Sequence, residues 1–382
     1  MLSLWYSQRA RSWAMQIALL GGLVLFVWWL AGNTHENLME RGIRTGFDYL
    51  WRPARFPISE SIVRYDASDS FFWAYVVGLA NTLWLSFLSI LFATLLGLVV
   101  GLSRRSAHPL LSRFAGTYVT VLRNVPLIVQ LLFWYAIATS LFPVPREALN
   151  PLPGVFLSIR GIYAPALTLG PGASILLIVA AILLVIAFVG GFKLSAGNRL
   201  PVKAASVGLS LCIWAAAVVW LSGRFGHPIG LEAPALKGLN FRGGMVLSPE
   251  FAAIITGLTI YTSAFIGEII RGGIDAVEKG QWEGGRALGL SERQIMFRII
   301  LPQALRIIVP PMTSQYLSTV KNTTLAVAVG YPELGLVVNT VINQTGQAIE
   351  SILIMLAVFL SISLSVSAFM NWYNARVALV VR

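Results

Sequence analysis

The stretch from Gln281 to Pro302 reads QWEGGRALGLSERQIMFRIILP and predicts two short helices joined by a tight turn. Gly289 is placed to take the left-handed conformation after the first helix, because glycine has no Cβ to clash there. Ser291, followed by Gln294 three residues later, is typical of a capping box that starts the second helix. Pro302 should end that helix, since proline lacks a backbone donor and restricts the residue before it.

The second predicted helix is amphipathic. Ile295 and Ile299 are apolar, whereas Arg293 and Arg298 place charge between them. These helix signals alone leave open a plain connector lying on a membrane surface.

The sequence on both sides of this stretch has the composition of a membrane protein. Of the 382 residues, 57% are hydrophobic and 12% are charged, against roughly a quarter charged in soluble domains. The apolar residues gather in runs of about twenty, long enough for a helix to cross a bilayer. They predict an all-α polytopic membrane protein with about eight transmembrane helices, at residues 14–31, 75–102, 125–142, 174–192, 204–222, 251–270, 304–330 and 350–370.

An even number of spans puts both termini on one side of the membrane. By the positive-inside rule, the loops richest in lysine and arginine face the cytoplasm. We therefore expect a multi-pass protein of a bacterial inner membrane with cytoplasmic N- and C-termini. The basic residues that carry this prediction are Arg9, Arg11, Arg104, Arg105, Arg113, Lys193, Arg199, Lys203, Arg286, Arg293 and Arg298.

The charge and the cysteine content exclude other classes of protein. The formal net charge is +12, but no basic stretch is interleaved with stacking aromatics, so we expect the lipid bilayer and not nucleic acid as the partner. The single cysteine, Cys212, excludes internal disulfides, and no histidine spacing suits a metal, so no cofactor or metal is predicted. Two Pro- and Gly-rich stretches, 143–173 and 223–249, are expected to be irregular outer loops.

The segment from Glu283 to Pro302 resembles the cytoplasmic signature loop of binding-protein-dependent ABC permeases, written E-A-A-x3-G-x9-I-x-L-P. The spacing matches throughout, and Gly284 and Gly285 stand where that family usually has alanine. The resemblance implies that the loop couples the membrane domain to a dimer of ATP-binding subunits and that its apolar face is the docking surface. The residues it assigns to coupling are Glu283, Gly284, Gly285, Gly289, Ser291, Ile299, Leu301 and Pro302.

Three further motifs resemble the polar amino-acid branch of that family. They are Gly78-Leu-Ala-Asn-Thr-Leu, Arg123-Asn-Val-Pro-Leu-Ile-Val-Gln130 and Lys321-Asn-Thr-Thr-Leu-Ala. The arrangement of spans is larger than in standard members of that branch and is similar to that of permeases of general L-amino-acid transporters. This resemblance implies a type I ABC importer transmembrane domain. It also implies a homologous permease partner in a heterodimer, a periplasmic amino-acid-binding protein, and L-amino acids as substrates.

On this plan the chain has four parts. Residues 1–72 form an N-terminal span and periplasmic loop, and residues 73–142 the first part of the permease core. Residues 143–250 are inserted loops and a helical hairpin. Residues 251–382 form the second part of the core and contain the coupling loop at 276–303.

A polar stripe in the seventh predicted span marks a candidate substrate path. Gln315, Ser318, Thr319 and Asn322 recur at helical spacing, with Lys321 beside them, so they share one face that needs a wet pathway or a subunit interface. In the sixth span, Thr259 and Ser263 belong to a second stripe, for which packing between helices is the competing interpretation. Pro310 and Pro311 predict a bend, either a gate or a static kink.

Two other functions are alternatives for a chain with these apolar spans. An ion-coupled secondary transporter would need inverted repeats and acidic residues in mid-span, and an intramembrane enzyme would need a catalytic motif. The sequence shows neither, and it contains no G-x-x-x-x-G-K-[ST] phosphate loop. It therefore predicts a non-catalytic transport subunit that works by alternating access, with ATP bound by a partner chain.

Overall fold

The structure is a computed structural model that describes residues 8–40, 45–169, 208–210, 212–214, 216, 220, 223–224 and 229–377. The chain divides into two compact units. One comprises Met1–Leu131 and Ile254–Arg382, and the other comprises Leu132–Ala253.

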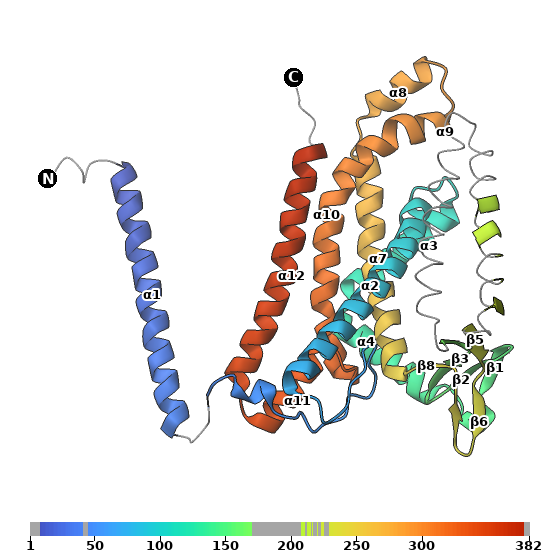
Figure 1. Ribbon diagram of the computed structural model, residues 1–382. Coiled ribbons are helices and arrows are strands. Elements are labelled where there is room, and N and C mark those ends of the chain that lie inside the picture. The colour runs from blue at the N-terminus through green and yellow to red at the C-terminus, as the bar shows by residue number, and fades with distance from the viewer. Residues whose placement is uncertain are drawn as a thin grey trace. The chain divides into compact units, whose positions relative to one another are not determined.

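The first unit is built from helices (Figure 1). Two helices are shared with the second unit along the chain: α4 (Leu127–Ser140) begins in the first unit, and α7 (Pro249–Asp275) ends in it. The other elements of the first unit are α1 (Gln8–Glu40), η1 (Asp48–Trp51), α2 (Phe71–Arg104), α3 (Pro109–Asn124), α8 (Lys279–Ala287), α9 (Glu292–Ile295), η3 (Met296–Ile300), α10 (Leu301–Asn322), η4 (Thr323–Val329), α11 (Leu334–Thr345) and α12 (Ala348–Val377).

Five helical segments in the described part of the chain are long and apolar enough to cross a membrane. They are Arg11–Thr34, Phe71–Arg104, Pro249–Asp275, Glu292–Val329 and Ala348–Trp372. These confirm the helices predicted at 14–31, 75–102, 251–270, 304–330 and 350–370.

The third predicted span differs from a simple helix, because α3 and α4 form a pair bent by 105°. The predicted spans at 174–192 and 204–222 lie largely outside the described residues. The count of eight therefore stays a prediction.

Buried apolar side chains hold the first unit together in several clusters. The cluster at the α11 end joins the segment after α1 to α2 and α11, through residues such as Tyr49, Phe56, Phe71 and Val337. The cluster at the opposite end joins α7, the segment 276–303 and α10. Figure 1 shows α8 and α9 at one end of α7 and α10, and α11 at the other.

The second unit contains strands where irregular loops were predicted. The order in the larger sheet is β1-β2-β3-β8, and β4 pairs with β5 and β6 with β7, all antiparallel. The strands are β1 (Leu149–Leu152), β2 (Val155–Ser158), β3 (Gly161–Ala164), β4 (Ala166–Leu169), β5 (Ile229–Glu232), β6 (Ala235–Lys237), β7 (Asn240–Arg242) and β8 (Met245–Leu247), with η2 (Pro145–Glu147) before them.

The glycines and prolines read as loop signals are instead the turns and the edge of this sheet. Gly154, with φ of +78°, makes the turn between β1 and β2. Pro151 lies in the edge strand β1, where a missing N–H is tolerated. Phe156 and Phe241 stack with ring centroids 4.5 Å apart, and this contact packs two strands that are distant in sequence.

Candidate functional site

The turn predicted in the segment 276–303 is present. Gly289 has φ of +71°, and the N–H of Leu290 donates to the carbonyl of Gly285 at 3.2 Å, five residues back. This is the glycine-terminated ending of a helix that satisfies its last carbonyls. The prediction for Gly289 is confirmed.

The capping box that starts the next helix is also confirmed. The N–H of Gln294 donates to the Ser291 hydroxyl at 3.4 Å, and the N–H of Ser291 donates to the Gln294 side-chain oxygen at 2.9 Å. Two otherwise unpaired donors are satisfied reciprocally, so the entry angle of α9 is fixed locally.

The prediction that Pro302 ends this helix is wrong. After α9 the chain makes a π-helical turn over Met296–Ile300, in which Leu301 N–H donates to the Met296 carbonyl five residues back. Pro302 then falls in the first turn of α10, where no backbone donor is required. The wider turn therefore carries the helix across the proline, and the coupling segment is continuous with α10.

The chain itself covers part of the apolar face that the family resemblance assigns to docking. Ile295 and Ile300 are fully buried in one cluster with Ile270 and Ile274 of α7. Ile299 and Leu301 are half-buried. The chain's own α7 covers Ile295 and Ile300, because the loop folds back on the helix that precedes it. Docking through Ile299 and Leu301 stays a prediction.

One of the two departures from the family pattern has a structural reason. A Cβ added to Gly285 would lie 2.8 Å from Cγ1 of Ile295, too close for any side chain without movement. A Cβ at Gly284 would meet nothing within 4 Å. Glycine at 285 therefore lets α8 approach α9, whereas nothing in the structure explains Gly284.

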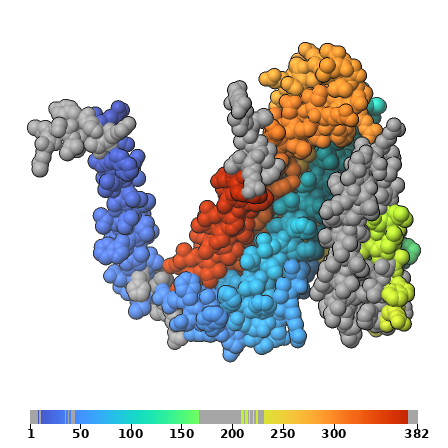
Figure 2. Space-filling model, turned by 45° about the horizontal axis from the view of Figure 1, so that its top comes forward, coloured from blue at the N-terminus to red at the C-terminus, as the bar shows by residue number. Residues whose placement is uncertain are grey.

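The outer surface of the segment combines charge with two large apolar side chains. Leu288 is 78% exposed and Phe297 is 59% exposed. Glu283 is also exposed, and Arg286 pairs with Glu292 at 2.7 Å. In Figure 2 this orange segment forms a knob beyond α10. A surface of this kind suits a protein partner.

The segment is tied to α2 through a residue that the sequence identified only as part of a basic loop. Arg105 Nε lies 2.8 Å from an Asp275 carboxylate oxygen, and its guanidinium lies 5.7 Å from the ring centroid of Trp282 in α8. Asp275 also accepts from Arg271 at 2.7 Å. The sequence signal that could have indicated this contact is the spacing of Arg271 and Asp275, four residues apart at the end of α7.

The motif that begins at Arg123 builds the bend between α3 and α4. Val125 follows the last residue of α3, and Pro126 precedes α4. The buried Gln130 amide donates from Nε2 to the carbonyls of Leu122 at 2.9 Å and Val125 at 3.0 Å. Gln130 thus satisfies the carbonyls that the bend leaves open.

The Asn-Thr pair of the motif in α2 holds the turn before α11. Asn81 Nδ2 donates to the carbonyls of Glu60 and Pro332, both at 2.8 Å. The Thr82 hydroxyl accepts from the N–H of Leu334 at 3.0 Å and contacts the Glu333 carboxylate at 3.4 Å. The motif therefore fixes the backbone that precedes α11 against α2.

Glu333 is a buried carboxyl group between two candidate spans. Its side chain accepts from the N–H of Leu336 at 3.0 Å and caps α11. Burial raises the pKa of Glu333 to about 7, although hydrogen bonds from Gly335, Leu336 and Thr82 favour the charged form. It makes none of the ion pairs in the described residues.

The structure separates the predicted polar stripe of α10. Thr319 is buried, and its hydroxyl lies 3.3 Å from that of Thr262 on α7. Gln315 and Asn322 are half-buried, whereas Ser318 and Lys321 are exposed. α10 continues through Pro310 and Pro311. A path role for the outward residues stays a prediction.

The two residues predicted in α7 lie within helix packing. The Ser263 hydroxyl is 2.7 Å from that of Tyr118 on α3 and donates to the Ile260 carbonyl at 2.8 Å. Thr259 Oγ1 is enclosed and has no hydrogen-bond partner among the described residues. The packing interpretation accounts for Ser263.

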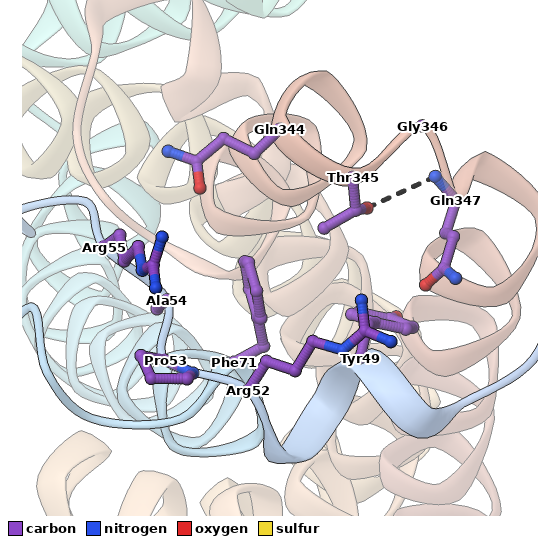
Figure 3. Close-up of a pocket in the computed structure, with 10 residues that line it drawn as sticks. All are labelled: Tyr49, Arg52, Pro53, Ala54, Arg55, Phe71, Gln344, Thr345, Gly346 and Gln347. Atoms are coloured by element: carbon purple, nitrogen blue, oxygen red, sulfur yellow. Dashed lines mark hydrogen bonds between the residues drawn. The ribbon is translucent and has the colours of Figure 1, made fainter. Parts of the chain in front are cut away.

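A cavity of about 740 Å³ lies at the α11 end of the unit (Figure 3). Arg52 and Arg55 at its edge are both exposed, and neither takes part in an ion pair in the described part of the chain. Two exposed guanidiniums thus border the cavity. The lining residues are Tyr49, Arg52, Pro53, Ala54, Arg55, Phe71, Gln344, Thr345, Gly346 and Gln347.

These features define a multi-pass membrane protein that carries a folded helix–turn–helix segment at one end of its helices. Residues 93–379 match the family described as the inner membrane component of binding-protein-dependent transport systems, and the chain belongs to that family. It is thus a non-catalytic permease subunit of an ABC importer in the inner membrane, and ATP is hydrolysed by a separate subunit. This membership excludes the ion-coupled alternative.

Three relatives match nearly the whole chain. The ABC transporter permease protein YhdX of Escherichia coli (strain K12) is 43% identical, over 97% of this chain and 95% of the relative. The general L-amino acid transport system permease protein AapQ of Rhizobium johnstonii is 37% identical, over 99% and 94%. The glutamate/glutamine/aspartate/asparagine permease protein BztB of Rhodobacter capsulatus is 34% identical, over 99% and 96%.

Proposed function

We propose that this chain translocates L-amino acids as one half of a heterodimeric membrane domain. The relatives that match over its full length are named for general L-amino acid transport and for glutamate, glutamine, aspartate and asparagine transport. The motifs in α2 and at the α3–α4 bend, which resemble the polar amino-acid branch, have defined structural roles here. The observation that carries the proposal is this full-length similarity together with the folded coupling loop.

The coupling loop (residues 276–303) is the docking site for a dimer of ATP-binding subunits. Its buried face joins it to α7 and α10, so a force on its exposed face reaches both helices directly. A second, homologous permease subunit completes the membrane domain. Gln315, Ser318, Lys321 and Asn322 are its substrate-path candidates.

The α11 end receives the periplasmic amino-acid-binding protein. Arg52 and Arg55 border a cavity there, which suits acidic side chains on that partner. Replacing both with glutamate should raise the binding-protein concentration needed for half-maximal stimulation of ATP hydrolysis. The same change at the exposed Arg64, outside the cavity lining, should have little effect.

In this orientation the coupling loop and both termini are cytoplasmic. α12 runs from the α11 end to the coupling-loop end (Figure 1), which supports a C-terminus on the coupling-loop side. Cys212 is the only cysteine, so Cys212→Ala gives a background for single-cysteine labelling. On that background, Lys279→Cys should react with a membrane-impermeant maleimide in inverted vesicles and not in right-side-out spheroplasts.

Reconstituted transport tests the function itself. The chain is co-purified with its ATP-binding and second permease subunits and placed in proteoliposomes with the binding protein outside. We expect ATP-dependent uptake of radiolabelled L-amino acids, lost without the binding protein. Uptake driven by an ion gradient without ATP, or no uptake of any amino acid, would contradict the proposal.

A further inference from the structure

The four-stranded sheet of the second unit has one face that is partly covered by a neighbouring hairpin. Paired residues of adjacent strands share a face, so Phe156 of β2, Tyr163 of β3 and Val246 of β8 lie on the same side. The ring of Phe241 in β7 stacks on Phe156 with centroids 4.5 Å apart and lies 4.9 Å from the ring of Tyr163. The β6–β7 hairpin therefore packs on this side of the sheet.

The opposite side of the sheet carries only apolar side chains. They alternate along β2, β3 and β8 with the residues of the first side, and β1 adds two more. Leu149, Leu152 and Met245 are 52%, 63% and 47% exposed, and the others are half-buried. We call this surface the Leu152 face. It consists of Leu149, Leu152, Val155, Leu157, Ile162, Ala164, Met245 and Leu247.

The connections of the sheet hold it close to the membrane. α4 ends at Ser140 and β1 begins at Leu149, while β8 ends at Leu247 and α7 begins at Pro249. The two apolar runs predicted as a helical hairpin lie between β4 and β5 in the sequence. Even the longest of these connections, residues 141–148, spans at most about 30 Å when extended. The sheet therefore lies near the bilayer surface, at the end of α7 opposite the coupling loop.

The chemistry of the Leu152 face favours lipid over a protein partner. An exposed apolar patch marks either a protein interface or a membrane contact. A protein interface has about one hydrogen bond per 100–200 Å², and the side chains of this face offer no ordinary donor or acceptor. Hydrogen bonds between strands already satisfy the backbone of β2 and β3, so this surface tolerates apolar surroundings.

Positive charge stands beside the Leu152 face. Arg146 lies just before β1, and Arg160 lies in the turn between β2 and β3. Both are exposed, and neither takes part in an ion pair in the described part of the chain. Guanidinium groups form charge-assisted hydrogen bonds with phosphate. An apolar surface with arginines beside it matches the layers of a phospholipid leaflet, with acyl chains beneath phosphates.

We propose that the Leu152 face lies on the phospholipid leaflet opposite the coupling loop, with Leu149, Leu152 and Met245 among the acyl chains and the two arginines at the level of the phosphates. This contact is independent of what the chain transports. Only Ser248 separates β8 from α7. The contact therefore also fixes the start of α7 at the bilayer surface.

Spin labelling of the full chain in nanodiscs of phosphatidylcholine and phosphatidylglycerol tests the proposal. On the Cys212→Ala background, a nitroxide is attached to Leu152→Cys or to Met245→Cys, and Lys237→Cys, at an exposed position of the β6–β7 hairpin, is the matched control. Oxygen concentrates in lipid, whereas a nickel chelate stays in water. The ratio of oxygen to nickel accessibility should be several-fold higher at 152 and 245 than at 237.

Two results would overturn the proposal. Nickel accessibility at 152 and 245 as high as at 237, in variants that elute like the wild type on gel filtration, would place the Leu152 face in water. Immobilised labels that neither reagent reaches would mean that protein covers the face. The measurement is repeated in the assembled transporter, where loss of oxygen accessibility on addition of the second permease subunit would assign the face to that subunit instead of lipid.

Discussion

At the scale of single residues, Gly285 sets how closely the two helices of the coupling loop approach. We predict that Gly285→Val separates α8 from α9, because its Cβ would meet Ile295 at 2.8 Å and a branched side chain leaves no small adjustment. The purified complex should lose a few degrees of melting temperature and much of its ATPase stimulation by the binding protein.

The matched control is Gly284→Ala, where the added Cβ meets nothing within 4 Å. It should keep or raise stability, since alanine favours an exposed helix over glycine by about 1 kcal/mol. If Gly285→Val and Gly284→Ala had the same effect on melting temperature and on ATPase stimulation, the close approach of α8 and α9 at residue 285 would not matter for function.

We expect the free energy of unfolding to depend on pH through Glu333, which lies at the α11 end of the first unit. Its pKa is raised from 4.5 to about 7 by burial, so the folded state holds a proton that the unfolded state releases. Its contribution is fully present below about pH 4.5 and is lost as the pH rises toward 7. We predict that Glu333→Gln flattens the fall in melting temperature over this range.

The measurement is a set of thermal melts of wild type and Glu333→Gln in matched buffers. The difference in melting temperature between the two proteins should change between pH 5 and pH 7.5. A constant difference across that range would mean that Glu333 does not change protonation there.

Residue-level predictions from sequence succeeded where the interaction is local. Gly289 and Ser291 depend on neighbours within five residues, so spacing alone identified them. Ile295 could not be assigned a partner, because periodicity marks an apolar face without saying whether α7 or another protein covers it. Pro302 failed for a related reason: a π-helical turn is not visible in composition.

At the scale of elements, the bend between α3 and α4 depends on one buried amide. Gln130→Leu keeps the size of the side chain but leaves the carbonyls of Leu122 and Val125 without their donor. We predict a loss of about 1–3 kcal/mol in stability, measured by thermal or denaturant unfolding in detergent. Val129→Ala, at an exposed position in the same helix, should cost far less. An equal loss of stability in the two variants would contradict the capping role of Gln130.

Helices were predictable from sequence and strands were not. Runs of about twenty apolar residues fix a span by length alone. The strands have only three or four residues each, include Pro151, and pair partners such as Ile162 and Leu247 that are far apart in sequence. Their turns looked like loops because glycine marks both.

At the scale of the whole molecule, we propose that the outward surface of the coupling loop is where the ATP-binding subunits dock. The inner face is committed to α7 and α10, which leaves Leu288 and Phe297 as the large apolar side chains on the outside. The sequence motif located the loop but could not show that part of its apolar face packs on α7, because a motif gives residue types and spacing and not side-chain neighbours.

We predict that Leu288→Asp prevents assembly with the ATP-binding dimer while the chain still folds. A buried charge without a partner is costly at an interface, and Leu288 is 78% exposed in the free chain, so the change harms the complex and not the fold. Co-purification should fall at least ten-fold, with an unchanged gel-filtration profile of the free chain. Ala276→Asp puts the same charge at another exposed position of the loop and should retain the partner. Equal recovery with both variants would place the docking surface elsewhere, and loss with both would make charge rather than position the cause.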